Sequence, residues 1–284
     1  MKAKAQFLES GLATSLQDLG RVGYAKYGVP RSGVMDQKAY FLANALLGNM
    51  ENSPVLEWAM VPPKLHFSEP TIVVCTGAIV IPKINGEPKK MYQQLMVPAG
   101  GIMTFNFVGK GLYGYIAVKD GFCGEKILGS KSMFAPITEQ SVFKKNDHLR
   151  YVKSNYVGDN NAILKYEEDY FDQGCLEVFP GPEFELLSED AKKSLTENQF
   201  TISGIKSRMG VQLVERLVNG IPEILTGPVL PGTVQLTSSG SLIVLMRDCQ
   251  VTGGYPRVLQ LCDDAINILS QKITGKKIVF NLIK

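Results

Sequence analysis

The stretch 15–49, SLQDLGRVGYAKYGVPRSGVMDQKAYFLANALLGN, places the glycines at 20, 23, 28 and 33 and several fixed charges directly before a helix pattern. Apolar residues recur at 39, 42, 43, 46 and 47, which form one stripe of an α-helix over about 37–47. Asp36 suits the helix N-cap and Gly48 suits its C-terminal end. Because glycine permits positive φ and close backbone approach, we predict a turn-rich wall that this helix anchors.

Short apolar runs bounded by Gly, Pro, Asn and Ser dominate the rest of the chain, for example TIVVCTGAIVIP from residue 71 and SLIVLMRDC from residue 241. Their length and β-branched composition are typical of strands. Asn85-Gly86 predicts a hairpin, SSG at 238–240 predicts a turn, and GKGLYG at 109–114 predicts another hairpin turn because a strand follows it. Two further helices are expected near 188–195, capped by Ser188, and near 262–271. The protein is therefore predicted to be mainly β, with a few short helices.

The chain length of 284 residues allows one large domain or two smaller ones. A polar and acidic stretch at 155–173 is a plausible join, and 62–78 shares a strand–turn–strand pattern with 230–248. A duplicated β unit explains this similarity, and chance explains it equally well. We predict one domain over 1–284, with possible lobes at 1–160 and 174–284.

Composition excludes several classes of function. The net charge is +3 and the basic residues are scattered, which predicts no nucleic-acid partner. Five cysteines without C-x-x-C spacing favour a reducing compartment, hence the cytoplasm. The start MKAKAQFLES lacks the apolar run of a signal peptide, and no stretch is long and apolar enough for a membrane span.

The two histidines, His66 and His148, are too few for a three-histidine metal site, so no metal is predicted. A Ser-His-Asp nucleophile is disfavoured for the same reason. Neither glycine-rich run fits a nucleotide site. A strand follows GKGLYG where a dinucleotide fold needs a helix, and GEKILGSKS at 124–132 has Ser130 where a phosphate loop needs lysine.

Four stretches combine glycines with Asp, Arg, Glu or Gln: 17–36, 178–184, 207–210 and 247–257, the last preceded by PGTVQL at 231–236. Backbone N–H groups at glycine turns can hold an oxyanion or a carboxylate, and a fixed arginine adds a bidentate donor. Ion pairs that tie loops to a barrel, such as Asp18–Arg21 or Asp248–Arg257, explain any single stretch. Four stretches of one composition favour a shared cleft.

In order along the chain, these stretches resemble the biotin-dependent carboxyltransferase-like family. The resemblance starts with 15–49 and covers nearly the whole chain. It continues through PVLEWAMVPPKLHF (54–67), CTGA (75–78), DGFCGEKILGSKS (120–132), FPGPEF (179–184), SRMG (207–210), GTVQL (232–236) and RDCQVTGGYPRV (247–258). The first stretch and TGGYP are very specific. Ser207 and Met133 depart from the Asp and Thr usual in the family and change local polarity.

The resemblance implies a cyclophilin-like β-barrel, here with two related barrel-like lobes. Members of the family, which include the C subunit of 5-oxoprolinase and KipA, work beside a B subunit or KipI-like partner on small amides or lactams. The first expectation is therefore the C subunit of an ATP-dependent 5-oxoprolinase, which opens the 5-oxoproline lactam to glutamate together with the B subunit and a lactam-opening A subunit. Partners would supply the ATP site.

Two alternatives stay open. One is a carboxyltransferase subunit of a carboxybiotin-dependent urea or amide carboxylase. In that case biotin arrives on another protein, because no biotin-acceptor stretch is present. The other is a KipA-type regulator that binds a KipI-like kinase inhibitor.

The residues expected at the shared cleft fall into two groups. The predicted catalytic residues are Asp18, Arg21, Asp36 and Asp248. The predicted substrate-binding residues are Gly33, Asn44, Arg208, Gln235, Thr252, Gly253, Gly254, Tyr255 and Arg257. In the TGGYP loop the paired glycines allow unusual φ while Pro256 fixes its own φ, which is suited to a preorganised binding loop.

Overall fold

A computed structural model describes residues 3–107, 109–155, 169–218 and 220–283. The chain forms two compact units, one of Met1–Gly20 and Asp36–Glu168, the other of Arg21–Met35 and Asp169–Lys284. The predicted join at 155–173 lies largely outside the described residues, and the predicted lobe boundaries stay a prediction. The segment 21–35 belongs to the second unit, although its flanking residues belong to the first.

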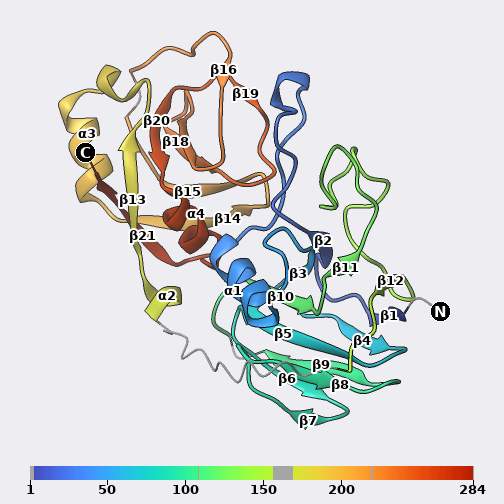
Figure 1. Ribbon diagram of the computed structural model, residues 1–284. Coiled ribbons are helices and arrows are strands. Elements are labelled where there is room, and N and C mark those ends of the chain that lie inside the picture. The colour runs from blue at the N-terminus through green and yellow to red at the C-terminus, as the bar shows by residue number, and fades with distance from the viewer. Residues whose placement is uncertain (1–2, 108, 156–168, 219, 284) are drawn as a thin grey trace. The chain divides into compact units, whose positions relative to one another are not determined.

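Two sheets make up the first unit (Figure 1). The seven-stranded sheet has the order β11 (Phe122–Cys123), β12 (His148–Tyr151), β1 (Ala3–Glu9), β4 (Lys64–Phe67), β9 (Ile102–Phe107), β6 (Val80–Ile84) and β7 (Glu87–Pro88). The five-stranded sheet has the order β2 (Ser15–Gln17), β3 (Val55–Ala59), β10 (Tyr113–Val118), β5 (Thr71–Gly77) and β8 (Leu95–Val97). Side chains from both sheets form one hydrophobic core that includes Phe7, Trp58 and Phe67.

Helix α1 (Gln37–Leu47) has the bounds that the sequence predicts. The Asp36 carboxylate accepts a hydrogen bond from the Ala39 N–H at 3.0 Å, and Gly48 ends the helix with φ of 60°. The apolar stripe packs on β5 and β10 (Figure 1). Local signals therefore fixed both ends of this helix.

The second unit is a closed barrel of seven strands. The order is β13 (Cys175–Pro180), β20 (Arg257–Leu261), β17 (Thr233–Leu236), β18 (Ser241–Leu245), β15 (Gly210–Arg216), β14 (Phe200–Lys206) and β21 (Lys277–Leu282). Neighbouring strands are antiparallel except β13 and β21, which are parallel. Closure satisfies the backbone groups that an open sheet would leave at its edges. A separate short ladder pairs β16 (Gly227–Pro228) with β19 (Thr252–Gly253).

Helices α3 (Glu189–Glu197) and α4 (Asp263–Ser270) confirm the two predicted near 188–195 and 262–271. The Ser188 hydroxyl caps α3 by accepting from the Ala191 N–H. The remaining helical elements are α2 (Asp169–Asp172) and the 3-10 turns η1 (Ala25–Tyr27) and η2 (Phe184–Leu186). The predicted mainly β fold, with a barrel and short helices, is confirmed. The first unit consists of two sheets over its described residues, whereas a barrel-like lobe was predicted there.

The structure contradicts one sequence prediction about strand pairing and gives no support to the suspected repeat. The run at 109–114 is not a hairpin turn, because it joins β9 of the seven-stranded sheet to β10 of the five-stranded sheet. In the suspected repeat, β17 and β18 pair with each other, whereas β4 and β5 lie in different sheets. The hairpin at Asn85-Gly86 is confirmed as the link between β6 and β7. No helix in the described part of the chain is long and apolar enough to cross a membrane.

Lys206 at the end of β14 carries a partly buried ammonium group. Burial lowers the pKa of Lys206 to about 8, and Nζ donates to the Lys272 carbonyl at 2.7 Å. In the unfolded chain the lysine has its ordinary pKa of about 10.4. Between pH 8 and this value, the unfolded chain therefore binds more protons than the folded chain. This lysine therefore destabilises the fold most below pH 8, and the penalty disappears as the pH rises toward ~10.

We expect Lys206→Met to melt at a higher temperature than the wild type near pH 7, and this advantage to shrink as the pH rises to about 10. The wild type gains stability over this range because its buried lysine loses its charge, whereas the variant has no lysine at this position. Thermal melts at several pH values measure this difference, in which the other titrating groups cancel. Lys193→Met, an exposed lysine of α3, controls for loss of a positive charge. A difference for Lys206→Met that does not change with pH would contradict the prediction.

Candidate functional site

Residues 31–33 meet the barrel at a buried ion pair between Arg208 and Asp248. Arg208 Nε lies 2.7 Å from Asp248 Oδ2, and Nη2 lies 3.0 Å from Oδ1. The Ser32 hydroxyl donates to Asp248 Oδ1 at 2.6 Å, and Arg208 Nη2 also donates to the Gly33 carbonyl. Ser32 and Gly33 have φ of 59° and 94°, which is why glycine suits the second position. We call Ser32, Gly33, Arg208 and Asp248 the Asp248 cluster.

The Asp248 cluster joins three of the four predicted glycine–charge stretches. Asp248 is 6% exposed, so its buried carboxylate is stabilised by the arginine and the hydroxyl that bind it. The sequence suggested Arg257 as the partner of Asp248. The structure gives it Arg208 and Ser32 instead.

Arg257 binds Glu183 in a two-point ion pair. Its Nε and Nη2 lie 3.0 and 2.7 Å from the two carboxylate oxygens, and Nη1 donates to the Pro228 carbonyl at 2.8 Å. These hydrogen bonds lower the pKa of the Glu183 carboxyl and raise the pKa of Arg257. The pair therefore ties the FPGPEF turn to β16 and β20, and this geometry favours a bracing role for Arg257.

Gln235 of β17 lies beside the TGGYP loop. Its side chain is buried at 2% exposure, and Nε2 has no hydrogen-bond partner among the described residues. A Cβ added to Gly253 would lie 2.4 Å from Nε2, so the amide fills the space that the missing side chain leaves. Thr252 and Tyr255 of the same loop are exposed. A buried amide donor without a partner costs free energy unless a ligand accepts its bond, so this is the best candidate for a substrate contact.

Asp18, a predicted catalytic residue in the first unit, is 2% exposed. Its carboxylate accepts from the hydroxyls of Ser130 and Ser132 and from the N–H groups of Gly20 and Lys131, at 2.5–2.9 Å. The loop at 124–132 superficially resembles a phosphate loop. Its hydrogen-bond donors bind a carboxylate of the same chain. This geometry favours a structural role for Asp18.

Asp36 and Asn44, both buried in the first unit, also have structural contacts. Asp36 caps α1. Asn44 donates from Nδ2 to the Ser53 carbonyl at 3.0 Å and accepts from Asn49 Nδ2 at 3.0 Å. It therefore braces the turn after the helix, and the contacts give no support to a role in binding substrate.

Arg21 lines a cavity of about 590 Å³ in the second unit, together with Arg31 and Arg247. The Arg21 and Arg247 side chains are buried, at 2% and 3% exposure. Arg247 Nη2 donates to Asn267 Oδ1 at 3.2 Å, and Nη1 lies 3.7 Å from Asp263 Oδ1. We call this space the arginine cavity. None of the predicted residues besides Arg21 lines it.

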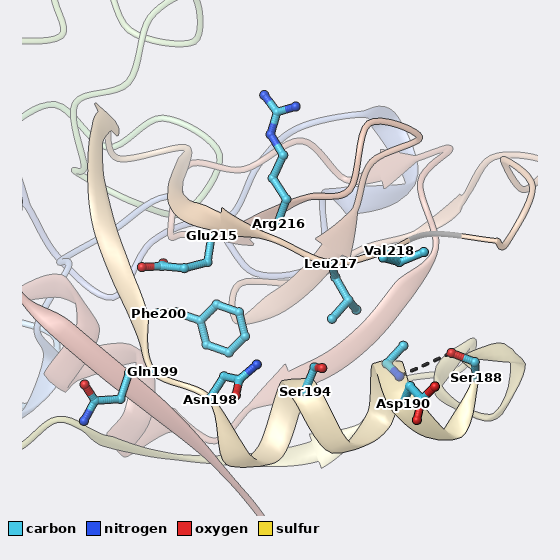
Figure 2. A pocket seen from close by; sticks show the side chains of 11 residues that line it. Ser188, Asp190, Ser194, Asn198, Gln199, Phe200, Glu215, Arg216, Leu217 and Val218 are labelled. Carbon is cyan, nitrogen blue, oxygen red and sulfur yellow. Dashed lines mark hydrogen bonds between the residues drawn. The ribbon is translucent and has the colours of Figure 1, made fainter.

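A second cavity in the same unit, of about 520 Å³, lies between α3 and the ends of β14 and β15 (Figure 2). Phe200 and Leu217 point into the space between helix and strand, whereas Arg216 points away from α3 (Figure 2). The Glu215 carboxylate already accepts two hydrogen bonds from Thr201. None of the predicted site residues lines this cavity, so we assign it no role. In the described part of the chain, no three His, Cys, Asp or Glu side chains gather as metal ligands would.

A family model matches most of the chain. The model of the carboxyltransferase domain, subdomain A and B, matches residues 27–282. The chain belongs to this carboxyltransferase domain family. Arg31, Ser32, Gly33 and all strands of the barrel lie within the matched residues.

Curated relatives of this family member fall into two groups. The C subunit of 5-oxoprolinase from Haemophilus influenzae is 29% identical over 275 residues, which cover 95% of this chain and 88% of that protein. The protein of the same name from Escherichia coli is 28% identical over 286 residues and covers 97% and 90%. The urea amidolyase of Lachancea kluyveri is 35% identical over 199 residues, which cover 68% of this chain but 10% of that protein.

The crystal structure of TTHA0988 has the same fold, with a TM-score of 0.90 at 28% identity. The match covers 99% of this chain and 56% of that one, so this carboxyltransferase domain spans about half the length of the matched structure.

Sequence reasoning missed Ser32, Glu183, Arg31 and Arg247 as parts of these sites. Each lies within a stretch that was singled out for its glycines and charges. Composition therefore indicated the right stretches, but it did not show which residues within them pair with each other.

Proposed function

We propose that this carboxyltransferase-family chain is the C subunit of a 5-oxoprolinase, a component of a multi-subunit hydrolase. The observation that carries the proposal is the extent of the match. The two relatives that bear this name align along 95–97% of this chain and 88–90% of their own length. The urea amidolyase match covers one tenth of that protein. A match along nearly the whole length of both proteins favours the first group.

The reaction expected of the complex is the ATP-dependent opening of the 5-oxoproline lactam to glutamate. Ser130, Lys131 and Ser132 of the loop at 124–132 donate to Asp18, which supports the proposal that the partner A and B subunits supply the ATP chemistry. Within the described residues, Gln235 Nε2 is buried without a hydrogen-bond partner beside Gly253, which supports a role for it as a donor to a substrate carbonyl oxygen. A fixed donor of this kind stabilises negative charge on an amide oxygen.

The Asp248 cluster positions the segment that carries Arg21 and Arg31. Arg208 and Ser32 hold the Asp248 carboxylate, and Arg208 holds the Gly33 carbonyl. Arg257 and Glu183 brace the strand that follows the TGGYP loop. These residues act through others, so they are positioning residues in this proposal.

The urea amidolyase relative keeps a second candidate function open, that of a carboxyltransferase subunit. In that case carboxybiotin on another protein would be the donor and urea or another amide the acceptor. The same Gln235 amide would then contact the acceptor carbonyl.

We expect the purified chain alone to show little or no release of glutamate from 5-oxoproline with ATP. Activity should appear when the A and B subunits from the same source are added, because the chain contributes only part of the site. Assays of each subunit, each pair and the trio measure this, with carboxylation of urea by a carboxybiotin protein as the parallel assay. ATP-dependent turnover by the single chain would overturn the composite-site proposal, and activity only in the urea assay would favour the second function.

A further inference from the structure

The arginine cavity carries an excess of positive charge. Arg21, Arg31 and Arg247 line it, and Asp263 is the one carboxylate among its lining residues. The Asp263 side chain is 82% exposed, so water screens much of its charge. Arginine keeps its charge at any physiological pH. The cavity therefore attracts an anion.

The rest of the wall is largely apolar. Phe179, Leu230, Leu261 and Ile266 line the cavity, and Phe179 and Leu230 remain 42% and 64% exposed. Large apolar side chains that stay exposed around a polar group mark a binding surface. The volume of about 590 Å³ lies within the usual range of small-molecule sites.

The amide of Gln260, which also lines the cavity, is engaged within the chain. It donates from Nε2 to the Pro231 carbonyl at 2.9 Å and accepts from the Thr233 hydroxyl at 2.8 Å. The positively charged groups that line the cavity are the guanidinium groups of Arg21, Arg31 and Arg247, and a guanidinium group matches the planar geometry of a carboxylate.

We propose that the arginine cavity binds a small organic carboxylate with a compact apolar body. The carboxylate faces Arg21, Arg31 and Arg247, and the apolar body packs on Phe179 and Ile266. A phosphate suits the site less well, because most of its wall offers no hydrogen bond. The assignment rests on the proposed function in one respect only, that 5-oxoproline, itself a carboxylate on a small ring, is the first ligand to test.

The test is calorimetric titration of the full chain without partners. Probes are 5-oxoproline, its uncharged analogue 2-pyrrolidinone, cyclopentanecarboxylate, which has no lactam, and inorganic phosphate. We expect both carboxylates to bind with Kd of about 1 mM or below and the uncharged lactam to bind at least about tenfold more weakly, because it lacks the charge-assisted bonds.

Arg31→Gln is the main variant, because Arg31 is exposed and its loss should not unfold the chain. It should weaken carboxylate binding by about tenfold or more. Arg216→Gln is the matched control, since Arg216 is an exposed arginine of the same unit that lines the other cavity. Carboxylate binding to this control should be unchanged.

The proposal is overturned if neither carboxylate binds. It is also overturned if phosphate binds as tightly as the carboxylates, or if Arg31→Gln and Arg216→Gln have the same effect on carboxylate binding. Binding of cyclopentanecarboxylate without 5-oxoproline supports the carboxylate cavity and counts against the proposed substrate. Carboxylate binding by the single chain, with no glutamate release by the trio, supports the cavity and counts against the proposed function alone.

Discussion

Replacing Asp248 by alanine should lower the melting temperature of the chain by about 6–20 °C. The carboxylate is 6% exposed and binds Arg208 and Ser32. Its removal deprives the Arg208 guanidinium, whose side chain is 20% exposed, of this carboxylate. Breaking such a pair costs about 3–5 kcal/mol, and each kcal/mol shifts the melting temperature by about 2–4 °C at this size.

A thermal melt of Asp248→Ala measures the effect, and Arg216→Gln on an exposed strand position should shift the melt by no more than about 2 °C. The double variant Arg208→Ala with Asp248→Ala should lose less than the two single variants together, because the pair is lost only once. A drop below about 2 °C for Asp248→Ala would show that the pair contributes little. These contacts predict that stability and turnover are both lost.

Gly253→Ala should lower the turnover of the assembled complex by about 100-fold, whereas Gly254→Ala should change it less than about twofold. The two glycines are adjacent, but a Cβ at Gly253 would lie 2.4 Å from Gln235 Nε2 and one at Gly254 would lie 3.5 Å from the Ile224 carbonyl. The first substitution must displace the buried amide, and the second makes an ordinary contact. Losing one such donor from a reacting amide oxygen costs about 100- to 1,000-fold in turnover.

The measurement combines turnover in the presence of the A and B subunits with the melting temperature of the same variant. Gln235→Met should reproduce the loss of turnover, and adding Gly253→Ala to it should bring little further loss, because both act through one group. If Gly253→Ala lowers the melting temperature by more than about 10 °C while the folded fraction turns over normally, the loop has a structural role, and Gln235 is not a substrate contact.

The sequence alone determined the features whose causes lie within a few residues. Asp36, the apolar stripe and Gly48 set both ends of α1, and Asn85-Gly86 set a hairpin. These signals act through hydrogen bonds and φ preferences of neighbouring residues. The order of the motifs also indicated the family. The family model that matches residues 27–282 confirms it.

Only the tertiary structure decided which distant groups pair. Ser32 reaches Asp248 across 216 positions, and Arg257 pairs with Glu183 across 74 positions, although Asp248 lies much closer in sequence. Likewise, β9 and β10 follow each other in the chain but belong to different sheets. Such partners depend on strand order, register and the path of loops, which local propensities do not specify. The stretches with functional composition could therefore be found from sequence, while the roles of Asp18, Gln235 and Arg257 depended on the groups that the fold places beside them.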